Sequence, residues 1–525
     1  MSENPKSKVP FTVFPTDLFE QREALASNPL LNRMKEVRKN QTDPHRPHYH
    51  YVNPEGVLND PNGLCYWKDQ WHLFYQGYPP DDERQHWGHA ISRDLMHWED
   101  LPYCIYPYPE DRCYSGSTFV EDDRVIAMYH GTRCGNMIAV SSDPLLLNWE
   151  KVGGDEPVIP IPADGENVAY NVFDPCIWRS NGKYYALSAG QRADGPGGQN
   201  VATDYLFESD NLKDWTYLHP FLEGDRYSRV GDDGACPYFW PLGDKHILCF
   251  FSHSSGGQYL LGDYDEERQK FTVTYGEKFN FGPPGPGGVH APSATPLGDG
   301  SVIVIFNMNP GKKTVGWDQI MSLPRRLTLA ESGNDVHMEP VGDVESMRGE
   351  LTELKPFNLQ ANTDVALRDL EDVADEALRG NVYELQVELQ PSRASMVELK
   401  VLQSPNQEEF TRISVYRERG YPDRATFTRQ RRTTFVTLDN AYASLDPGVH
   451  CRAPETLNVY IEPEEPIQLR VFVDRSIVEV FVNNRKAAAL RVYPSRDDSI
   501  EISMRSQGSS TQVSELKFWP LGSIY

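Results

Sequence analysis

Two aspartates that open similar segments are the residues of this chain best suited to do chemistry. Asp60 begins DPNGLCYWKDQWHLFYQ and Asp174 begins DPCIWRSNGKYYALS, so in each an Asp-Pro pair precedes an aromatic strand. Asp-Pro-Asn-Gly by itself is an ordinary turn sequence, and the functional argument depends on its repetition. Two carboxylates brought to one place repel each other, and chains tend to keep such pairs where one attacks a carbon or stabilises a cation.

The theme to which both aspartates belong returns five times. The copies start at Asp60, Ser115, Asp174, Ala235 and His290, so the steps are 55, 59, 61 and 55 residues. A period of this size with strand-turn-strand content is typical of propeller blades. We therefore expect an all-β fold in which five equivalent strand starts, two of them with carboxylates, meet at one central mouth.

Composition divides the chain into three predicted parts. Residues 1–44 form a polar N-terminal extension with helical composition over 17–40. Residues 45–345 hold the repeats and predict a five-bladed β-propeller. Residues 346–525 contain a linker, with a short helix expected within 349–380, and then alternating strands that predict a β-sandwich. A seam between two such domains is a further place for a ligand cleft.

Charge and cysteine usage exclude several classes of partner. The chain has 51 Lys and Arg against 76 Asp and Glu, a net charge of −25, which argues against nucleic acid or an anionic membrane as partner. The eight cysteines form no C-x-x-C pair, Cys236 is expected to be a buried thiol in an apolar strand, and we expect no cofactor. Without a signal-peptide core or a membrane span, the prediction is a cytoplasmic protein that binds a neutral ligand, its oligomeric state left open.

Longer motifs resemble those of glycoside hydrolase family 32, the invertases, inulinases and levanases. The segments concerned are RPHYHYVNPEGVLNDPNG (46–63), WHLFYQGYP (71–79), WGHAISRDLMHWEDLP (87–102), YSGS (114–117), GWDQIMSLPRRLTL (316–329) and VDRSIVEVFVNN (473–484). The resemblance covers roughly residues 46–520. It implies a five-bladed propeller followed by a sandwich, in agreement with the repeats.

This resemblance also implies a reaction, the cleavage of terminal β-D-fructofuranosides of the sucrose or fructan type with retention. Asp60 falls on the catalytic nucleophile of the family, and Asp174 on the aspartate that holds sugar hydroxyls and stabilises the transition state. The substrate-binding residues that we expect are Asn59, Gln76, Trp87 and Ser115.

Two departures from the family pattern concern the proton donor. Phe173 stands where the family has an arginine, and Ala235 where it has the acid/base glutamate. A positioned general acid contributes on the order of 10²–10⁴-fold to the rate. Asp233 is our first candidate for a replacement, followed by Asp232 and His290; alternatively, the aspartates cap a turn and the histidine bonds to backbone.

Three functional hypotheses therefore stay open. The chain is a β-fructofuranosidase, or a hydrolase or transferase of the same fold with shifted furanoside specificity and a relocated acid, or a non-catalytic sugar-binding protein. His48 and His50 share one strand face but lack a third ligand, so we expect no metal site. Tyr238 and Trp240 are expected in the core, and we assign no catalysis to Asp474 or Glu479 in the sandwich.

Overall fold

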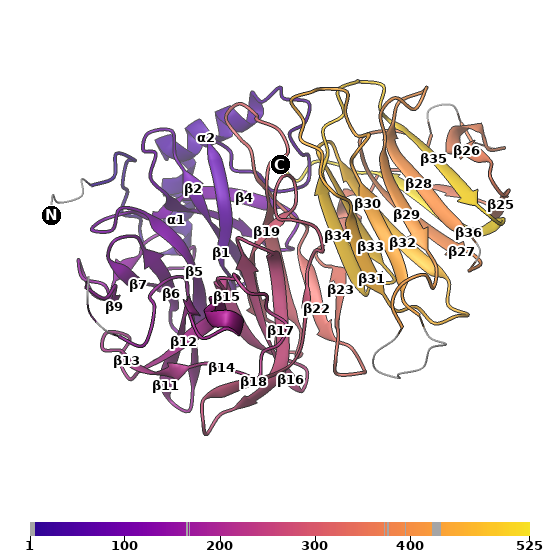
Figure 1. The fold of residues 1–525 in the computed structure, drawn as a ribbon. Coiled ribbons are helices and arrows are strands. Elements are labelled where there is room, and N and C mark those ends of the chain that lie inside the picture. Colours follow the sequence, from indigo (N-terminus) through magenta and orange to yellow (C-terminus); the bar gives the residue numbers. More distant parts are fainter. Residues whose placement is uncertain are drawn as a thin grey trace.

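Two β domains lie side by side in the computed structural model of this chain (Figure 1). It describes residues 6–163, 166, 168–371, 373–374, 377–393, 395–422 and 432–525. The first domain contains five sheets between residues 57 and 340, and the second contains two sheets between residues 352 and 520 of this described part. The predicted order of propeller and then sandwich is confirmed, and the exact boundary at residue 345 stays a prediction.

The first domain is made of propeller sheets 1 to 5, each named in chain order. Sheet 1 comprises β1 (Val57–Trp67), β2 (Gln70–Tyr78), β3 (His86–Ser92) and β4 (Trp98–Ile105). Sheet 2 comprises β5 (Cys113–Val120), β6 (Val125–Gly131), β7 (Gly135–Ser141), β8 (Glu150–Lys151) and β9 (Ile159–Pro160). Sheet 3 comprises β10 (Pro175–Ser180), β11 (Lys183–Arg192), β12 (Val201–Ser209) and β13 (Thr216–Pro220), with the short 3-10 helix η1 (Pro196–Gly198) between two of them.

Sheets 4 and 5 each have one additional short strand. Sheet 4 comprises β15 (Ala235–Leu242), β16 (Lys245–Ser252), β17 (Gly256–Asp265), β18 (Lys270–Lys278) and the short β14 (Leu222–Glu223), which runs parallel to β18. Sheet 5 comprises β19 (Val289–Pro296), β20 (Val302–Met308), β22 (Arg325–Leu329), β23 (Val336–Pro340) and the short β21 (Ile320–Met321). The second main strands of the five sheets are β2, β6, β11, β16 and β20, each antiparallel to the first main strand of its sheet.

The first main strand of each sheet lines the centre of the domain. These strands contact one another in the cyclic order β1, β5, β10, β15, β19, and β19 returns to contact β1. Buried aromatic and aliphatic residues fill the space between neighbouring sheets. The closed ring brings together the strand starts that the sequence spaces 55 to 61 residues apart.

Irregular pairing marks the mouth end of four of these inner strands. The register shifts between Leu58 and Pro61 in β1, between Cys113 and Gly116 in β5, between Ala235 and Tyr238 in β15, and between Val289 and Pro292 in β19. A β-bulge bends its strand and changes the direction of the side chains within it. Each shift includes or adjoins a residue of the candidate site described below.

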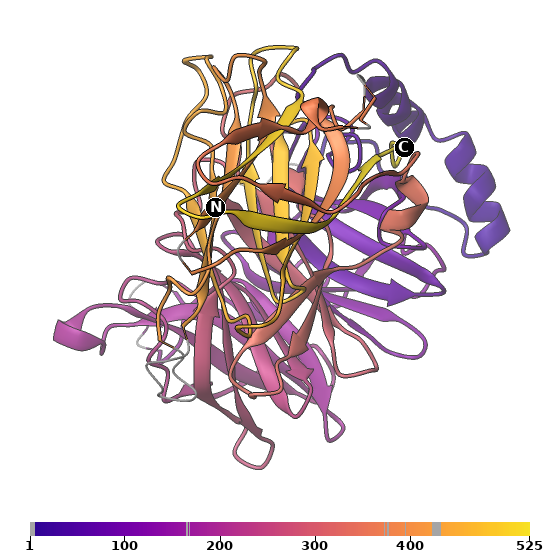
Figure 2. The ribbon, with the colours of Figure 1, turned by 90° about the vertical axis from the view of Figure 1, so that its right-hand side faces the viewer.

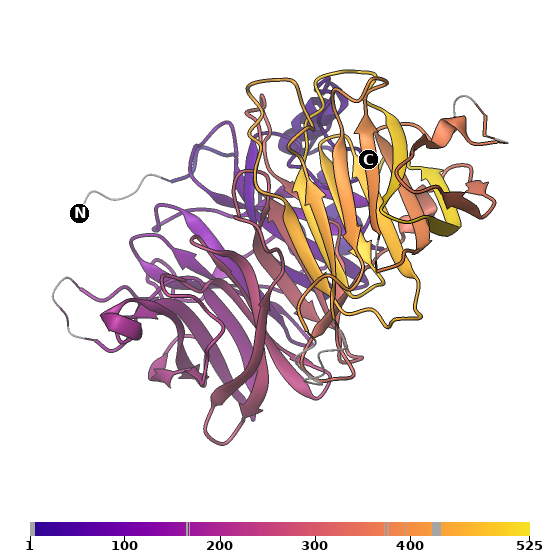
Figure 3. The same ribbon diagram turned by 45° about the vertical axis from the view of Figure 1, so that its right-hand side comes forward.

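Two sheets form the second domain (Figure 3). One comprises β24 (Thr352–Leu354), β36 (Thr511–Pro520), β27 (Val382–Gln390), β32 (Ile467–Asp474), β33 (Ile477–Val482), β34 (Lys486–Arg491) and β25 (Phe357–Leu359). The other comprises β26 (Asp364–Ala366), β35 (Glu501–Gln507), β28 (Met396–Gln403), β29 (Thr411–Tyr416), β30 (Thr434–Asp439) and β31 (Glu455–Val459). Aliphatic side chains of both sheets form one shared core, as in a sandwich.

The helices of the linker and of the N-terminal extension differ from those that we expected. In the described part of 349–380 the short helix is only the three-residue 3-10 helix η3 (Leu367–Asp369), and a second one, η2 (Val344–Met347), precedes it. The extension forms two helices, α1 (Leu18–Ala26) and α2 (Pro29–Lys39), because Asn28 caps a new helix start with Pro29 at its first position. Both helices lie on the outside of the propeller (Figure 2). Within the described residues, no helix has the length and apolar character needed to span a membrane.

A buried polar cluster joins the two domains. The Asp474 carboxylate, at the end of β32, accepts hydrogen bonds from the backbone N–H groups of His48, Tyr49 and His50 and from the His50 ring. On its other side the His50 ring meets Glu479 of β33 at 3.2 Å. These contacts hold the segment that leads into β1.

The described residues contain no group of His, Cys, Asp and Glu side chains arranged to hold a metal.

Candidate active site

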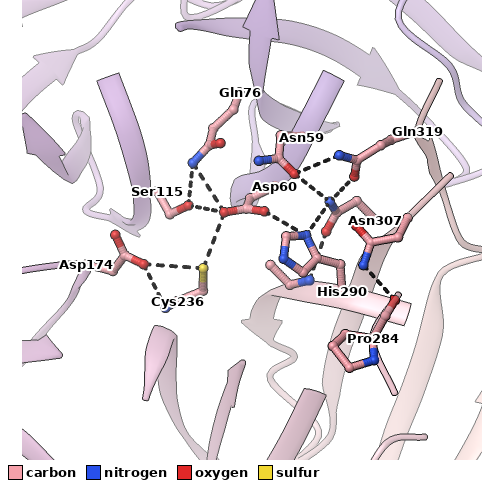
Figure 4. Close-up of polar contacts among 12 residues, drawn as sticks. Asn59, Asp60, Gln76, Ser115, Asp174, Cys236, Pro284, His290, Asn307 and Gln319 are labelled. Carbon is pink, nitrogen blue, oxygen red and sulfur yellow. Dashed lines mark hydrogen bonds and ion pairs between the residues drawn. The ribbon is translucent and has the colours of Figure 1, made fainter. Parts of the chain in front are cut away.

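Asp60 and Asp174 lie together at the centre of the propeller mouth (Figure 4). Asp60 lies within β1 and Asp174 directly precedes β10; they are 8% and 4% exposed. The Sγ atom of Cys236 lies 3.5 Å from Oδ2 of Asp60 and 3.4 Å from Oδ2 of Asp174. Because burial and the two carboxylates raise the pKa of the Cys236 thiol, the sulfur carries its proton and can donate to either aspartate.

Donors on one side fix the orientation of the Asp60 carboxylate. Its Oδ2 atom accepts from Ser115 Oγ at 2.6 Å and from Gln76 Nε2 at 3.2 Å. Gln76 Nε2 also donates to Ser115 Oγ at 2.7 Å, and its Oε1 accepts from Gln85 at 3.0 Å. Ser115 belongs to β5 and Gln76 to β2, so two sheets determine the position of one carboxylate.

The carboxyl group of Asp174 has a raised pKa. Burial, and secondarily the charge of Asp60, raise the pKa of Asp174 to about 7. The backbone N–H of Cys236 donates to Asp174 Oδ2 at 3.0 Å and partly opposes this effect. Cys236 can offer both its N–H and its thiol because its backbone adopts a φ of 53°, within the bulge of β15.

The other oxygen of Asp60 faces His290 and an amide cluster. Oδ1 of Asp60 lies 3.3 Å from Nδ1 of His290. The amide nitrogen of Asn307 donates to Oδ1 of Asn59 at 3.1 Å and to Oε1 of Gln319 at 2.6 Å. The same amide nitrogen lies 3.0 Å from Nδ1 of His290, so this ring nitrogen lies between the Asn307 amide and the Asp60 carboxylate. Burial lowers the pKa of His290, so the ring is neutral.

An apolar patch occupies the position from which the family glutamate would project. Ala235, Cys236, Phe251 and Ala291 form one buried cluster, and Phe173 packs against it. The two residues that depart from the family pattern, Phe173 and Ala235, therefore belong to the same patch.

Asp232 and Asp233, on the loop before β15, have separate surroundings. Asp232 is fully buried and accepts hydrogen bonds from the Arg229 backbone, Ser255 and Gln258. Asp233 instead accepts from Nδ1 of His253 at 2.6 Å and from the His253 backbone N–H at 3.2 Å. Among the described residues, neither aspartate has a hydrogen bond with Asp60 or Asp174.

Three aromatic residues of the predicted site or its neighbourhood lie inside the fold. Trp87 has 0% exposure, and its indole N–H donates to the Tyr114 carbonyl at 3.0 Å. Tyr238 bonds the Gly116 carbonyl, and Trp240 bonds the Ala294 carbonyl, so both join neighbouring inner strands. None of the three offers a ring face to a sugar.

Sequence reasoning did not identify several residues that surround the carboxylates. Cys236 was interpreted only as a buried thiol, although its place directly after Ala235 signalled its proximity. Gln85, Asn307 and Gln319 lie outside the strand starts, and no spacing rule indicated them. His253 follows β16, and its partner Asp233 lies 20 residues earlier, so only the pairing of β15 with β16 brings them together.

Family models match both domains of this chain. Residues 50–340 match the family model described as "Glycosyl hydrolases family 32 N-terminal domain", and residues 343–520 match "Glycosyl hydrolases family 32 C terminal". The chain is 28% identical to a sucrose-6-phosphate hydrolase of Zymomonas mobilis subsp. mobilis, covering 86% of this chain and 87% of that protein. It is 26% identical to a levanase of Bacillus subtilis, covering 92% of this chain and 71% of the levanase.

The fold has close counterparts among solved structures. The structure of fructan 1-exohydrolase IIa from Cichorium intybus superposes with a TM-score of 0.78 at 20% identity, covering 92% of this chain and 98% of that one. A sucrose-6-phosphate hydrolase from Lactobacillus gasseri superposes with a TM-score of 0.73 at 24% identity, covering 94% and 96%. Both similarities concern the fold. With family models matching both domains, the chain belongs to glycosyl hydrolase family 32 and is a glycosidase acting on O-glycosyl bonds.

Proposed function

We propose that this enzyme hydrolyses terminal β-D-fructofuranosides of the sucrose or fructan type by a retaining mechanism. Fructofuranoside hydrolysis is supported at the level of the family, by relatives named sucrose-6-phosphate hydrolase and levanase. The observation that carries the finer proposal is the buried pair of Asp60 and Asp174, both within 3.5 Å of one sulfur atom. Two carboxylates so close together repel each other when both are ionised, and such pairs are typical of sites where one attacks a carbon or stabilises a cation.

Asp60 is the nucleophile in this proposal. Its Oδ2 is occupied by Ser115 and Gln76, whereas Oδ1 makes no hydrogen bond with the described residues and has only His290 beside it. That asymmetry leaves one oxygen to attack the anomeric carbon while the other stays fixed. The covalent fructosyl intermediate is then released by water with net retention.

Asp174 stabilises the transition state from the same side of the mouth. As the furanose ring gains positive charge, hydrogen bonds from its hydroxyls to an ionised Asp174 become stronger. Asn59, Gln76 and Ser115 contribute polar groups near the same space and are the residues that we propose to orient the sugar. We do not include Trp87, because its side chain is fully buried.

The replacement Asp60→Asn tests the proposed nucleophile. Asparagine keeps the shape and can still accept from Ser115, but it cannot form the ester bond, so turnover of sucrose and of an activated aryl β-fructofuranoside should both fall at least 10⁴-fold. Product release is followed by chromatography and absorbance, and circular dichroism checks that the variant is folded. Turnover that survives the replacement with both substrates contradicts the proposal.

A second candidate function has a specific observation in its favour. The apolar patch of Phe173 and Ala235 changes the surface where the leaving group would lie, which favours a shifted furanoside specificity or transfer to an acceptor. A panel of sucrose, 1-kestose, inulin, levan and other furanosides, analysed for hydrolysis and transfer products, separates this candidate from the first. Binding of fructosides by calorimetry without turnover of any substrate, activated ones included, would instead indicate a sugar-binding protein.

A further inference from the structure

The proposed reaction requires a proton donor that Ala235 cannot provide. A sugar alkoxide is a poor leaving group, and a positioned general acid accelerates its departure by roughly 10²–10⁴-fold. Ala235 is 1% exposed and lies in the apolar patch with Phe173, so the usual source of the proton is absent from this wall of the mouth. The inference developed here rests on the proposed retaining hydrolysis.

Two polar groups near the mouth, His290 and Asp232, already have hydrogen-bond or ion-pair partners. Nδ1 of His290 lies 3.3 Å from the Asp60 carboxylate and 3.0 Å from the Asn307 amide nitrogen, and burial lowers the pKa of the ring. Asp232 is fully buried, and both of its oxygens accept hydrogen bonds from within its own loop and sheet. Neither group is therefore our candidate for the proton donor.

His253 is placed differently, at the mouth and open to solvent. Its side chain is 63% exposed, and it directly follows β16, whose residue Phe251 pairs with Ala235 across the sheet. The His253 ring lies 5.1 Å from the Phe251 ring and 6.2 Å from the His290 ring, between centroids. It therefore stands above the apolar patch, next to the histidine that contacts Asp60.

Asp233 fixes both the orientation and the tautomer of His253. One Asp233 oxygen accepts from Nδ1 at 2.6 Å and the other accepts from the backbone N–H of the same residue at 3.2 Å. With Nδ1 committed to the carboxylate, Nε2 is the nitrogen that can exchange a proton, and it makes no hydrogen bond with the described residues. A carboxylate that orients a histidine and stabilises its imidazolium form is a recurrent device in acid–base catalysis.

The charges around His253 favour the protonated ring. Its hydrogen bond with Asp233 raises the pKa of His253 above the ordinary value, burial opposes this, and the charges of Asp233, Asp60 and Asp174 add to the rise. Three carboxylates therefore raise the pKa of the His253 ring. The ring therefore keeps its second proton to a higher pH than an unperturbed histidine does.

We propose that His253, oriented by Asp233, is the general acid and base of this enzyme and replaces the glutamate lost at position 235. In the first step Asp60 forms a bond to the anomeric carbon, the bond from that carbon to the glycosidic oxygen breaks, and Nε2–H of His253 gives its proton to that oxygen. In the second step neutral Nε2 takes a proton from water as the water oxygen bonds to the anomeric carbon and Asp60 leaves. The histidine is again protonated at the end, and one water has been consumed.

The variant His253→Ala tests this assignment through the leaving group. With sucrose or 1-kestose, kcat should fall about 10²–10⁴-fold, because the alkoxide now leaves without a proton. With an activated aryl β-fructofuranoside, whose leaving group needs little protonation, the first step should slow less than about tenfold. Added azide should restore turnover of the aryl substrate, since this nucleophile needs no general base. His97→Ala is the matched control: His97 is also partly exposed and pairs with Asp94 at 2.8 Å, on the loop between β3 and β4.

A second measurement distinguishes proton transfer from a structural role. In the unmodified enzyme, the basic limb of the pH profile of kcat/KM should correspond to the loss of the His253 proton. Asp233→Asn removes the charge that raises this pKa, so the limb should move to lower pH while Tm changes little.

The outcomes separate this inference from the function on which it rests. If Asp60→Asn abolishes turnover but His253→Ala behaves like His97→Ala with every leaving group, then the assignment of His253 is wrong and the proposed function stands. If Asp60→Asn leaves turnover unchanged, both are wrong. Equal losses of kcat/KM, which reports the first step, on sucrose and on the aryl substrate in His253→Ala would also overturn the proposed acid role.

Discussion

At the scale of single residues, Asp174 connects the geometry of the mouth with a measurable pH dependence. Its carboxyl is buried beside Asp60 and is held by the N–H and the thiol of Cys236. Burial and the Asp60 charge raise its pKa to about 7. A carboxylate that must be negative to stabilise a cation is therefore only half ionised at neutral pH.

We expect the acidic limb of the kcat/KM profile to lie near pH 7 rather than near pH 4. Above this value Asp174 is ionised and can act, whereas below it the carboxyl is protonated, so activity should rise as the pH increases through 7. Initial rates with 1-kestose between pH 4 and 9 measure the limb. A profile that is already flat at pH 5 would contradict the assigned role of Asp174.

Cys236→Ala should move this limb to higher pH, because the variant loses a thiol donor that lowers the pKa of Asp174. Cys249→Ala provides the matched control. Cys249 is a fully buried thiol of the same sheet and, among the described hydrogen bonds, has none with either carboxylate.

At the scale of strands and sheets, the β-bulges explain how similar strand starts in different sheets present different side chains to the mouth. The irregular pairings at Asn59–Asp60, Ser115, Cys236 and His290 change the direction of these side chains at the mouth, while the regular part of each strand packs in the core. Asp174 precedes the regular pairing of β10 and reaches the mouth without such a shift.

Asp204 of β12 shows the cost of a carboxyl that the reaction does not use. It is 3% exposed, its Oδ1 has no hydrogen-bond partner among the described residues, and burial raises its pKa to about 8, with a smaller effect of Asp225. Because the unfolded chain has the ordinary value of 3.8, the folded state binds the extra proton between pH 4 and 8. Stability that depends on this proton is therefore lost as the pH rises through that window.

Asp204→Asn should remove this pH-dependent loss of stability, since the amide side chain stays neutral at every pH in the same window. We expect the variant to be about 1–3 kcal/mol more stable than the unmodified enzyme at pH 8, with a smaller difference at pH 5. Urea unfolding at both pH values measures this. An equal effect at both would mean that the carboxyl does not titrate in the folded state.

At the scale of the whole molecule, the sandwich stabilises the propeller segment that leads into the nucleophile strand. Burial alone would raise the pKa of Asp474 and lower that of His50, but their mutual hydrogen bond shifts both the other way, so the pair is ionised. Glu479 extends the cluster to Arg325 of β22 at 2.8 Å. Both acidic residues thus hold the domains together, and the expectation that they take no part in catalysis stays a prediction.

Asp474→Ala should destabilise the enzyme by about 3–5 kcal/mol, because it leaves the buried His50 and three backbone N–H groups without their acceptor. The matched control is Asp498→Ala, which breaks an exposed pair with Arg496 and should destabilise the enzyme far less than Asp474→Ala does. Denaturant unfolding compares the two. Similar losses in both variants would show that the cluster contributes little to the seam.

The sequence by itself determined the architecture and the two central aspartates. The spacing of Asp60, Ser115, Asp174, Ala235 and His290 predicted repeated sheets around one mouth, because identical strand starts in a cyclic array must converge. Period-two alternation predicted the sandwich but not the order of its strands in the two sheets. These features follow from local patterns, which a chain carries regardless of its long-range contacts.

Only the tertiary structure decided which groups surround the carboxylates and in what protonation state. Trp87 matched a family position but is buried, Cys236 was read as an inert thiol but links both aspartates, and His253 meets Asp233 only because β15 pairs with β16. Burial and the distance between charges set the pKa of Asp174, and neither can be read from residue order. Contacts between separate sheets depend on the closure of the ring, which no local pattern specifies.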